Sequence, residues 1–518
     1  MKAQRERIVK ATALIAALEL LTAGAGLLKQ MLVAAQFGTS ETTDAYVVAM
    51  TVVALIQLWL TLPIRQVILP MFRYDLARDG EQHAWANISI LLNNLGLIVI
   101  VIAAAGWLFA PPLVSLMTPG FEKGTNELAI ELTRITMVSI VLISPSMVLE
   151  QILFSYERFF LPGITDLVNN LATMLMLLVL GSTYGIYGLA TAVVVGAACE
   201  FASQLPILWE KRKLYRWRID LRHPGMREVG RLSFPLLFAN SSVEIARITD
   251  RIFASLLPGG SLSALSFGSR LISIFSDLLV GPLQKSTFPH FTRLSAEENF
   301  PALSRQLSLY FRMMLFLTLP IGIGMMVAAE PIVRVLYQRG AFDETSVRLT
   351  SQSLACYALG FPALALGRIL TRTFVSLKDT WTPTKTSLMR IGLKILLSWA
   401  LIHPFALMGL ALAESFSQII RTSLLFFLLP DQVKGQESRN TVKSLGEISV
   451  ACMLMGVAVY LVKEKITGLF SVHVELATLV LCGVVSYSAF AFLRRAEEVQ
   501  PLFRALTSLG AKYLPRRS

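Results

Sequence analysis

The feature that most constrains this 518-residue chain is a series of long apolar runs, each of roughly twenty residues with few charges. A helix of about 20 apolar residues can cross the hydrocarbon core of a membrane, because it satisfies its own backbone hydrogen bonds there. The runs predict about fourteen such helices, and hence an all-α polytopic membrane protein. The expected spans are 11–36, 45–69, 88–110, 129–155, 162–181, 186–208, 231–256, 263–288, 309–328, 348–375, 386–403, 406–429, 446–463 and 474–493.

The composition excludes other classes of protein. Hydrophobic residues make up 54% of the chain and charged residues only 16%, which is too apolar for a soluble globule, a disordered chain or a disulfide scaffold. The net charge of +13 comes from loops between the apolar runs rather than from a basic patch interleaved with aromatic residues. We therefore expect membrane lipids, and no nucleic acid, as partners.

The charges of the loops predict the orientation of the helices. The loop after the sixth span reads EKRKLYRWRIDLRHPGMREVGR and is strongly basic, whereas residues 37–44 carry only Glu41 and Asp44. Because cytoplasmic loops are enriched in Lys and Arg, this pattern places both termini in the cytoplasm.

The two halves of the chain resemble each other at a nearly constant offset. QVILPMF with Pro70 corresponds to KSTFPHF with Pro289, and APPLVSLMTPGF corresponds to AEPIVRVLYQRGAF, both at an offset of 219. YGIYGLATA with Gly188 corresponds to FALMGLALA with Gly409 at 221. Parallel repeats of this kind suit transport by alternating access. We expect a six-helix lobe at 8–210, a second at 227–430, helices 13 and 14 within 444–495, and a cytoplasmic basic tail at 496–518.

Ionisable residues inside spans are costly in free energy and are therefore candidates for function. In the span 231–256, Glu244, Arg247 and Arg251 share one helix face, and Asp250 is within reach of Arg247. Either this face lines a water-filled cavity, or its residues form salt bridges between packed helices. Other ionisable residues in spans are Glu19, Glu150, Asp166, Glu200, Asp277, Arg372, Arg390, Lys394, Glu414 and Arg421.

Arg270 and Arg368 have no acidic residue within four positions, so each needs an anion or a distant acidic partner. A substrate phosphate fits, because a guanidinium binds phosphate through paired donors. The alternative is that both side chains extend to the membrane interface. Glu150 could bind a coupling cation or a proton, or could hydrogen-bond between helices.

Motifs for enzymatic chemistry are missing from the sequence. There is no G-x-x-x-x-G-K-[ST], no G-x-S-x-G and no H-E-x-x-H, and the four cysteines form no CxxC pair. We therefore predict a transporter with no catalytic residue, metal site or cofactor, driven by a substrate gradient, an ion gradient or the membrane potential.

Three segments carry a family resemblance. LVAAQFGTSETTDAYVVA (32–49), DRIFASLLPGGSLSALSFGSRL (250–271) and the stretch 331–383, with its R-G-A-F motif, resemble MurJ/MviN-type lipid II flippases of the MATE/oligosaccharide-flippase superfamily. The resemblance implies a bacterial cytoplasmic-membrane protein that flips undecaprenyl-pyrophosphate-linked peptidoglycan precursor by alternating access, for cell-wall synthesis. The implied partners are this glycan lipid and cell-wall synthesis enzymes.

The resemblance also implies site residues. The family's central cavity is cationic, and its basic residues match Arg270, Arg368 and Lys29, while an acidic residue matches Asp44. With the charged face of the span 231–256, the candidates for binding the pyrophosphate are Arg270, Arg368, Lys29, Arg251 and Arg247. The candidates for gating or coupling are Asp44, Asp250, Glu244 and Glu150.

The chain departs from the family at several charged positions, where Ala23, Gln30, Gln57, Leu58, Ser269 and Ser273 stand. These departures leave three alternatives open. One is a flippase for another undecaprenyl-linked oligosaccharide, such as an O-antigen or exopolysaccharide unit. The others are a cation-coupled multidrug exporter, whose cargo a cationic cavity would repel, and a membrane scaffold that transports nothing.

Overall fold

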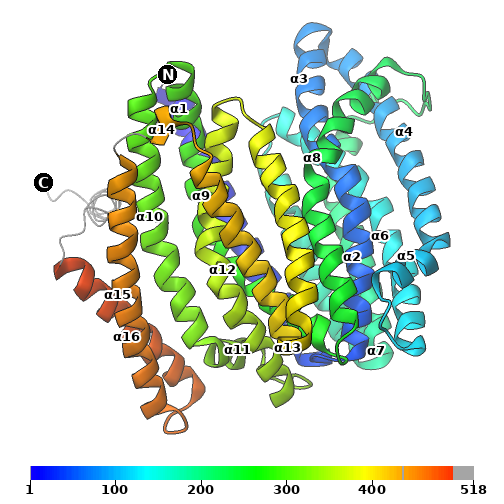
Figure 1. Cartoon of the computed structure of the whole chain (residues 1–518). Helices are drawn as coiled ribbons and strands as arrows, with labels where there is room; N and C mark the ends of the chain where they lie inside the picture. The colour runs from blue at the N-terminus through cyan, green and yellow to red at the C-terminus, as the bar shows by residue number, and fades with distance from the viewer. Residues whose placement is uncertain (1, 435–436, 494–518) are drawn as a thin grey trace, which may run out of the picture. The chain divides into compact units, whose positions relative to one another are not determined.

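The computed structural model describes residues 2–434 and 437–493, and these residues form helices and no strands (Figure 1). The helices are α1 (Lys2–Phe37), α2 (Glu41–Pro63), η1 (Ile64–Ile68), α3 (Leu69–Arg78), α4 (Gly80–Leu108), α5 (Ala110–Met117), α6 (Lys123–Ser155), α7 (Phe160–Glu210), α8 (Pro224–Ser255), α9 (Ser261–Ala296), α10 (Phe300–Val327), α11 (Ala329–Tyr337), α12 (Glu344–Ser376), α13 (Trp381–Phe427), α14 (Asp431–Lys434), α15 (Glu437–Ile466) and α16 (Val472–Leu493). The predicted all-α fold is confirmed. The predicted tail 496–518 lies outside the described residues.

The helix count fits the predicted spans. Within the described residues, eleven helices are long and apolar enough to cross a membrane. Two of them, α7 and α13, contain a break at Gly185 and Ala406, so each supplies two spanning segments. The helix α8 is 32 residues long but carries the charged face of the span 231–256. Together these helices account for the fourteen expected spans.

The internal repeat is visible in the backbone. The short helices α5 and α11 begin at residues 110 and 329, the predicted offset of 219. The breaks in α7 and α13 have nearly the same dihedral angles, with φ 55° and ψ −133° at Gly185 and φ 47° and ψ −123° at Ala406. Equivalent sequence motifs therefore make equivalent turns in the two halves of the chain.

A glycine is required three residues after each break. A Cβ added at Gly188 would lie 2.5 Å from the carbonyl oxygen of Leu180, and one added at Gly409 would lie 2.2 Å from that of Leu401. Neither backbone could return this close to the preceding helix with a larger residue. This requirement explains the matching glycines of YGIYGLATA and FALMGLALA.

The chain divides into two compact units. The first comprises Met1–Ser263 and Arg339–Ser346, and the second comprises Ala264–Gln338 and Val347–Ser518. The first unit therefore holds α1–α8 and a short segment from the middle of the second predicted repeat.

The core of the first unit lies at one end of its helices. Phe72 of α3 packs edge-on against Trp85 of α4, with ring centroids 6.1 Å apart, and both side chains are buried. The indole nitrogen of Trp85 donates a hydrogen bond of 2.8 Å to the hydroxyl of Tyr156, so its one polar group is satisfied. The connection between α3 and α4 is thereby fixed against the end of α6.

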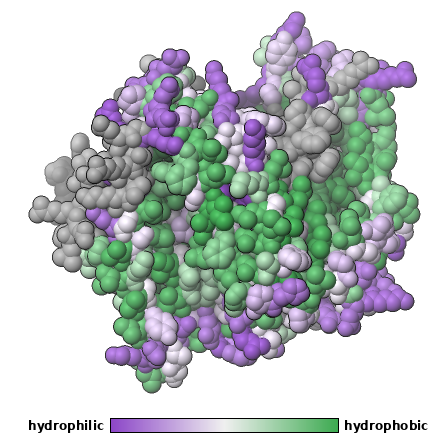
Figure 2. Space-filling model, viewed as in Figure 1, coloured by the Kyte–Doolittle hydropathy of each residue, from purple (hydrophilic) through white to green (hydrophobic). Residues whose placement is uncertain are grey.

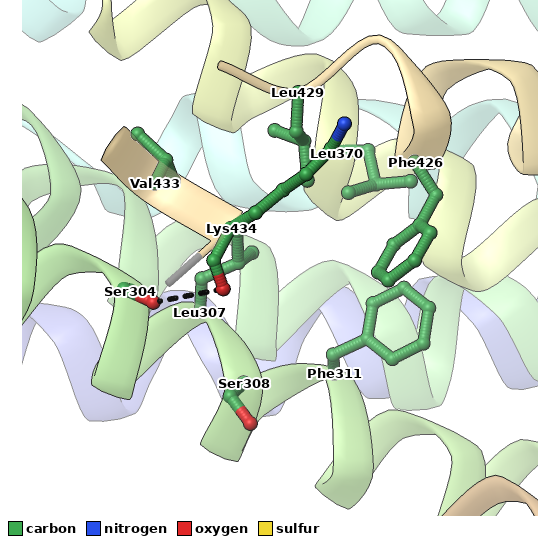
Figure 3. A pocket seen from close by; sticks show the side chains of 9 residues that line it. All are labelled: Ser304, Leu307, Ser308, Phe311, Leu370, Phe426, Leu429, Val433 and Lys434. Carbon is green, nitrogen blue, oxygen red and sulfur yellow. Dashed lines mark hydrogen bonds between the residues drawn. The ribbon is translucent and has the colours of Figure 1, made fainter. Parts of the chain in front are cut away.

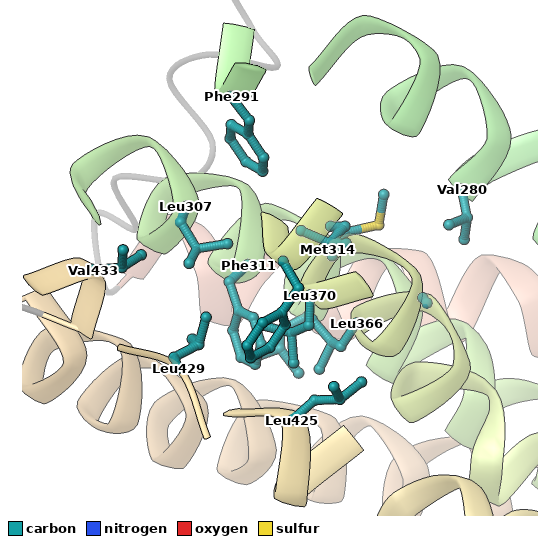
Figure 4. Close-up of a cluster of buried hydrophobic side chains, with 14 of the residues drawn as sticks. Val280, Phe291, Leu307, Phe311, Met314, Leu366, Leu370, Leu425, Leu429 and Val433 are labelled. Carbon is teal, nitrogen blue, oxygen red and sulfur yellow. The ribbon is translucent and has the colours of Figure 1, made fainter. Parts of the chain in front are cut away.

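The core of the second unit joins α9, α10, α12, α13 and α15. Figure 4 shows Phe311 and Met314 of α10 beside Leu366 and Leu370 of α12, with Leu425 of α13 opposite them. All five side chains are buried. In a membrane, such packing holds helices together through close contact, because lipid is as apolar as the core itself.

The surface has the pattern of a membrane protein. Figure 2 shows hydrophobic side chains over the middle of the helices and hydrophilic ones at the helix ends. Large apolar side chains such as Val179, Leu396 and Leu481 are about two-thirds exposed (65%, 65% and 64%). Contiguous apolar surface of this kind suits lipid and would aggregate in water.

The basic connection between α7 and α8 is held in place by two asparagines of α4. The amide of Asn93 donates to the carbonyls of Arg216 and Arg218, each at 3.1 Å. Asn94, fully buried, donates to the carbonyl of Asp220 and accepts from its amide. This long basic loop is therefore ordered along the helix that it accompanies.

Candidate functional site

A buried carboxylate organises one end of the first unit. Asp44, in the first turn of α2, is 2% exposed and accepts two backbone hydrogen bonds. They come from the amide of Gly260 at 2.7 Å and from that of Ser263 at 2.6 Å. Ser263 lies in the first turn of α9, where unpaired amides and the helix dipole both favour a negative charge. Asp44 therefore anchors the start of α9 to the start of α2.

The R-G-A-F segment docks beside this carboxylate. The amide of Ala341 donates to the carbonyl of Ala35 at the end of α1, at 2.8 Å. The hydroxyl of Thr39 donates to the hydroxyl of Ser346 at 2.8 Å. We refer to Ala35–Asp44, Leu256–Ser263 and Arg339–Ser346 together as the junction. All three segments lie within the first unit.

Two glycines with positive φ make this docking possible. Gly38 has φ +57°, and a Cβ there would lie 2.3 Å from the carbonyl oxygen of Ala341. Gly340 has φ +56°, and a Cβ there would lie 2.2 Å from the carbonyl oxygen of Ala35. Backbone thus packs directly on backbone, which only glycine permits at these dihedral angles. This contact explains why glycine, and no larger residue, stands at position 340 in the R-G-A-F motif.

The charged face of α8 combines an ion pair with exposure. Arg247 lies 3.0 Å from Glu244, whose side chain is 7% exposed while that of Arg247 is 53% exposed. The Nε of Arg251 donates to the hydroxyl of Thr51 on α2 at 2.9 Å. Arg247 thus pairs with Glu244, and Asp250 is half-buried on the same helix. This face of α8 therefore contains an ion pair, and the guanidinium of Arg247 in that pair is still half-exposed.

The two predicted phosphate ligands of the second unit have different surroundings. Arg368 of α12 lies 3.7 Å from Asp277 of α9, with side chains 36% and 71% exposed. Asp277 is thus the distant acidic partner that the sequence analysis required for Arg368 without identifying it. The ion pair is weak because both side chains are partly exposed. Arg270 of α9 is exposed, and no carboxylate within the described residues lies at ion-pair distance from it. Arg270 is therefore available for an anionic ligand.

The remaining predicted residues lie in the first unit. Lys29 is half-buried on α1, and Glu150 is half-buried on α6. Glu200 of α7 is 6% exposed and accepts a hydrogen bond of 2.7 Å from the amide of Asn169. That bond is a helix-to-helix contact of the kind expected for a buried acid.

An ion-pair cluster in α13 was not among the predicted site residues. Glu414, beyond the break, lies 2.9 Å from Arg390 and 2.6 Å from Lys394, which both precede it. The Lys394 side chain is only 2% exposed. The three charges were visible in the sequence, but their contact depends on the turn at Ala406 that folds α13 back on itself.

A small apolar pocket lies in the second unit. Figure 3 shows Phe311 and Phe426 facing it, with the carbonyl of Lys434 accepting a hydrogen bond of 3.4 Å from Ser304. None of its lining residues is among the predicted site residues. Across the described part of the chain, no group of three His, Cys, Asp or Glu side chains is placed to hold a metal ion.

The helices, the repeat and the charges inside the spans define a polytopic membrane transport protein built from two similar halves. A family model described as lipid II flippase MurJ matches residues 33–481. The chain belongs to this family. The recognition of the family from the three sequence segments is thereby confirmed.

Named relatives match over almost the whole chain. The probable lipid II flippase MurJ of Thermotoga maritima is 27% identical over 480 residues, which cover 92% of this chain and 95% of the relative. The lipid II flippase MurJ of Burkholderia cenocepacia is 24% identical over 506 residues, covering 96% and 93%. The match thus includes both repeats and the two last helices.

Solved structures share the fold. A lipid II flippase MurJ in an inward closed conformation has a TM-score of 0.77 at 23% identity, covering 93% of this chain and 99% of that one. An inward-facing multidrug resistance MATE family transporter of the MOP superfamily has a TM-score of 0.66 at 13% identity, covering 81% and 94%. The chain therefore shares its fold with both of these structures.

Proposed function

We propose that this protein translocates lipid II across the bacterial cytoplasmic membrane by alternating access, with both termini in the cytoplasm. The observation that carries the proposal is the match of the family model to residues 33–481. The expected cargo is a lipid with a pyrophosphate and a glycan head. Cell-wall synthesis enzymes, which make and consume such a lipid, are the proposed partners.

In this proposal Arg270 and Arg368 bind the pyrophosphate. Arg270 is exposed on α9. Arg368 forms only a weak ion pair with Asp277, whose side chain is largely exposed. A phosphate could therefore replace Asp277 at little cost, because a guanidinium binds phosphate through two parallel hydrogen bonds. Within the first unit, the further candidates for binding the pyrophosphate are Arg247, Arg251 and Lys29.

The junction is the proposed gate. Asp44 is the proposed gating residue, because its two hydrogen bonds hold the junction closed. Closed, it ties the turn between α1 and α2 to two segments of the second predicted repeat. Alternating access requires such a contact to form in one state and break in the other. Glu244, Asp250 and Glu150 are the proposed coupling residues, because carboxylates at membrane depth can exchange a proton or cation.

The test is complementation in a bacterium depleted of its own lipid II flippase, with outer-leaflet lipid II as the readout. The wild-type chain should restore growth and outer-leaflet lipid II, and Arg270→Ala or Arg368→Ala should lose both. The matched control is Arg372→Ala, one turn along α12, whose guanidinium lies over the ring of Phe288 at 5.1 Å. It should complement.

Two outcomes would count against the proposal. If the wild-type protein reaches the membrane and does not complement, the cargo is another undecaprenyl-linked oligosaccharide or the chain is a scaffold. Movement of defined glycan lipids in purified vesicles separates these two. If the wild type complements and both arginine variants do so equally well, the phosphate-binding assignment is wrong while the family function stands.

A further inference from the structure

The connection between α7 and α8 exposes basic and apolar side chains together. Six of the twelve residues from Lys211 to Arg222 are Lys or Arg, and only one is acidic. Trp217 is 80% exposed, and Ile219 and Leu221 are exposed as well. We refer to Lys211–Arg222 as the basic segment. Exposed aromatic and aliphatic side chains between cations are typical of a surface that meets water on one side and an apolar phase on the other.

The backbone of the basic segment is held in a fixed position. The side-chain amides of Asn93 and Asn94, on α4, donate hydrogen bonds to three of its carbonyls. Leu214 and Tyr215 pack against the buried core of the first unit, and the hydroxyl of Tyr215 donates to Asn93. Because these two side chains and the backbone are already engaged, the segment presents its remaining side chains in a defined place.

That place is the border between the polar and the apolar surface of α4 (Figure 1). On the side of Asn93 towards the start of α4, Gln82 and His83 are exposed. On the other side, Leu97 and Val101 are 37% and 59% exposed. Because a helix rises about 1.5 Å per residue, these two lie about 6 and 12 Å along the axis from Asn93. The basic segment therefore lies where the lipid-facing surface of α4 begins.

Only part of the positive charge of the segment is neutralised. The Nζ of Lys211 lies 2.7 Å from Glu81, and Arg218 lies 3.6 Å from the one acidic residue of the segment. The guanidinium of Arg212 lies over the ring of Trp209, 5.1 Å from its centroid. Three further cations are exposed and form no ion pair within the described part of the chain: Lys213, Arg216 and Arg222. This surplus would attract anions at the membrane surface.

We propose that the basic segment binds the phosphate groups of anionic phospholipids at the membrane surface. Lys213, Arg216 and Arg222 supply the positive charge. Trp217 and Ile219 enter the headgroup region, where side chains with an apolar body are favoured. An acidic protein is the competing partner, but the position of the segment at the edge of the apolar surface favours lipid. The site uses none of the proposed pyrophosphate ligands and does not depend on the cargo.

The experiment measures how anionic lipid gathers around the segment in vesicles that contain the full-length protein. The four native cysteines are replaced, and Leu221→Cys carries a fluorophore that brominated lipids quench on contact. Brominated phosphatidylglycerol is compared with brominated phosphatidylcholine at equal composition of both leaflets, so the orientation of the protein has no effect. Half-maximal quenching should need an at least about tenfold lower mole fraction of phosphatidylglycerol, because each nearby cation strengthens the attraction about fivefold.

Salt and phosphate identify the source of the anionic group. The preference for phosphatidylglycerol should weaken between about 0.05 and 0.5 M salt, because screening shortens the reach of exposed charges. Inorganic phosphate at constant ionic strength should leave the preference unchanged. Its abolition by phosphate would show a site for the free ion and overturn the assignment to lipid. Equal quenching by the two lipids at low salt would overturn the proposal and indicate an acidic protein as the partner.

Substitutions locate the preference. Lys213→Gln/Arg216→Gln should lower it at least about fivefold, and Lys213→Glu/Arg216→Glu should lower it further. Both variants should keep the unfolding midpoint, because the two side chains are exposed. The matched control is Lys123→Gln/Arg134→Gln in the first half of α6, where Arg134 donates to a carbonyl about 20 Å along α4 from Asn93. It should keep the wild-type preference. Full preference in both variants of the segment would refute the site.

Discussion

Replacement of Asp44 tests whether the junction opens during transport. Asp44→Ala removes the acceptor of two short hydrogen bonds, from the amides of Gly260 and Ser263. Hydrogen bonds to a charged group contribute about 1.5–3 kcal/mol each, so the closed junction should lose about 3–6 kcal/mol. Because about 1.4 kcal/mol is a factor of ten, the closed state should lose a factor of about 100 to 10,000 relative to open states. Asp44→Asn keeps one acceptor oxygen and should lose about half of this free energy.

The assay is labelling of a single cysteine placed at Leu262, which is fully buried in the junction. The four native cysteines are first replaced. A membrane-impermeant maleimide added to whole cells then reports how often residue 262 is exposed. The labelling rate should rise at least about a hundredfold in Asp44→Ala, the lower end of the expected range, and less in Asp44→Asn.

The control is Asp79→Ala, in the connection between α3 and α4, where the carboxylate is 41% exposed and lies 4.0 Å from Arg78. An exposed pair of this length contributes little, so labelling at residue 262 should not change. If Asp44→Ala is folded and its labelling rate equals that of the parent, the carboxylate does not hold the junction closed and the reasoning is refuted.

Two further predictions concern the backbone and pH. Gly340→Ala should lower the free energy of unfolding by about 2–3 kcal/mol in denaturant titrations, because both the positive φ and the contact with Ala35 are violated. Gly468→Ala, at φ +82° with open space around it, should lose only the conformational part; equal losses would show that the contact contributes nothing. Hydrogen bonds from Thr382 and the amide of Trp381 lower the pKa of Asp379, in the turn before α13, so its contribution to stability should be present above about pH 4 and lost as pH falls below it. The measurement is the midpoint of unfolding as a function of pH. In Asp379→Asn the fall of this midpoint at acid pH should become smaller, and an unchanged fall would contradict the assignment.

The sequence determined the membrane class, the helix positions and the repeat. Apolar runs with few charges predict spanning helices because each must satisfy its backbone in lipid, and this rule is local to each segment. The repeat was equally readable, since the residues that make the turns at Gly185 and Ala406 are fixed by backbone geometry. The three motif segments were sufficient to identify the family, as the family model confirms.

The sequence located charges but not their partners. It identified Asp44 as a candidate, yet the amides that this carboxylate holds lie 216 and 219 positions away. It showed that Arg368 needs an anionic partner but not which one. The structure places Asp277, on a different helix, 3.7 Å from Arg368. Distances along the chain carry no information about such pairs, because the pairing depends on how helices pack.

Only the tertiary structure decided which polar groups share an environment. The turn at Ala406 folds α13 back, so that Arg390 and Lys394 meet Glu414, and α12 then places Thr371 and Gly367 beside Arg421. The docking of the R-G-A-F segment on α1 likewise depends on backbone contact across more than 300 residues of sequence. Hydrophobicity therefore determines where this chain crosses the membrane, while close packing determines which charges pair with one another.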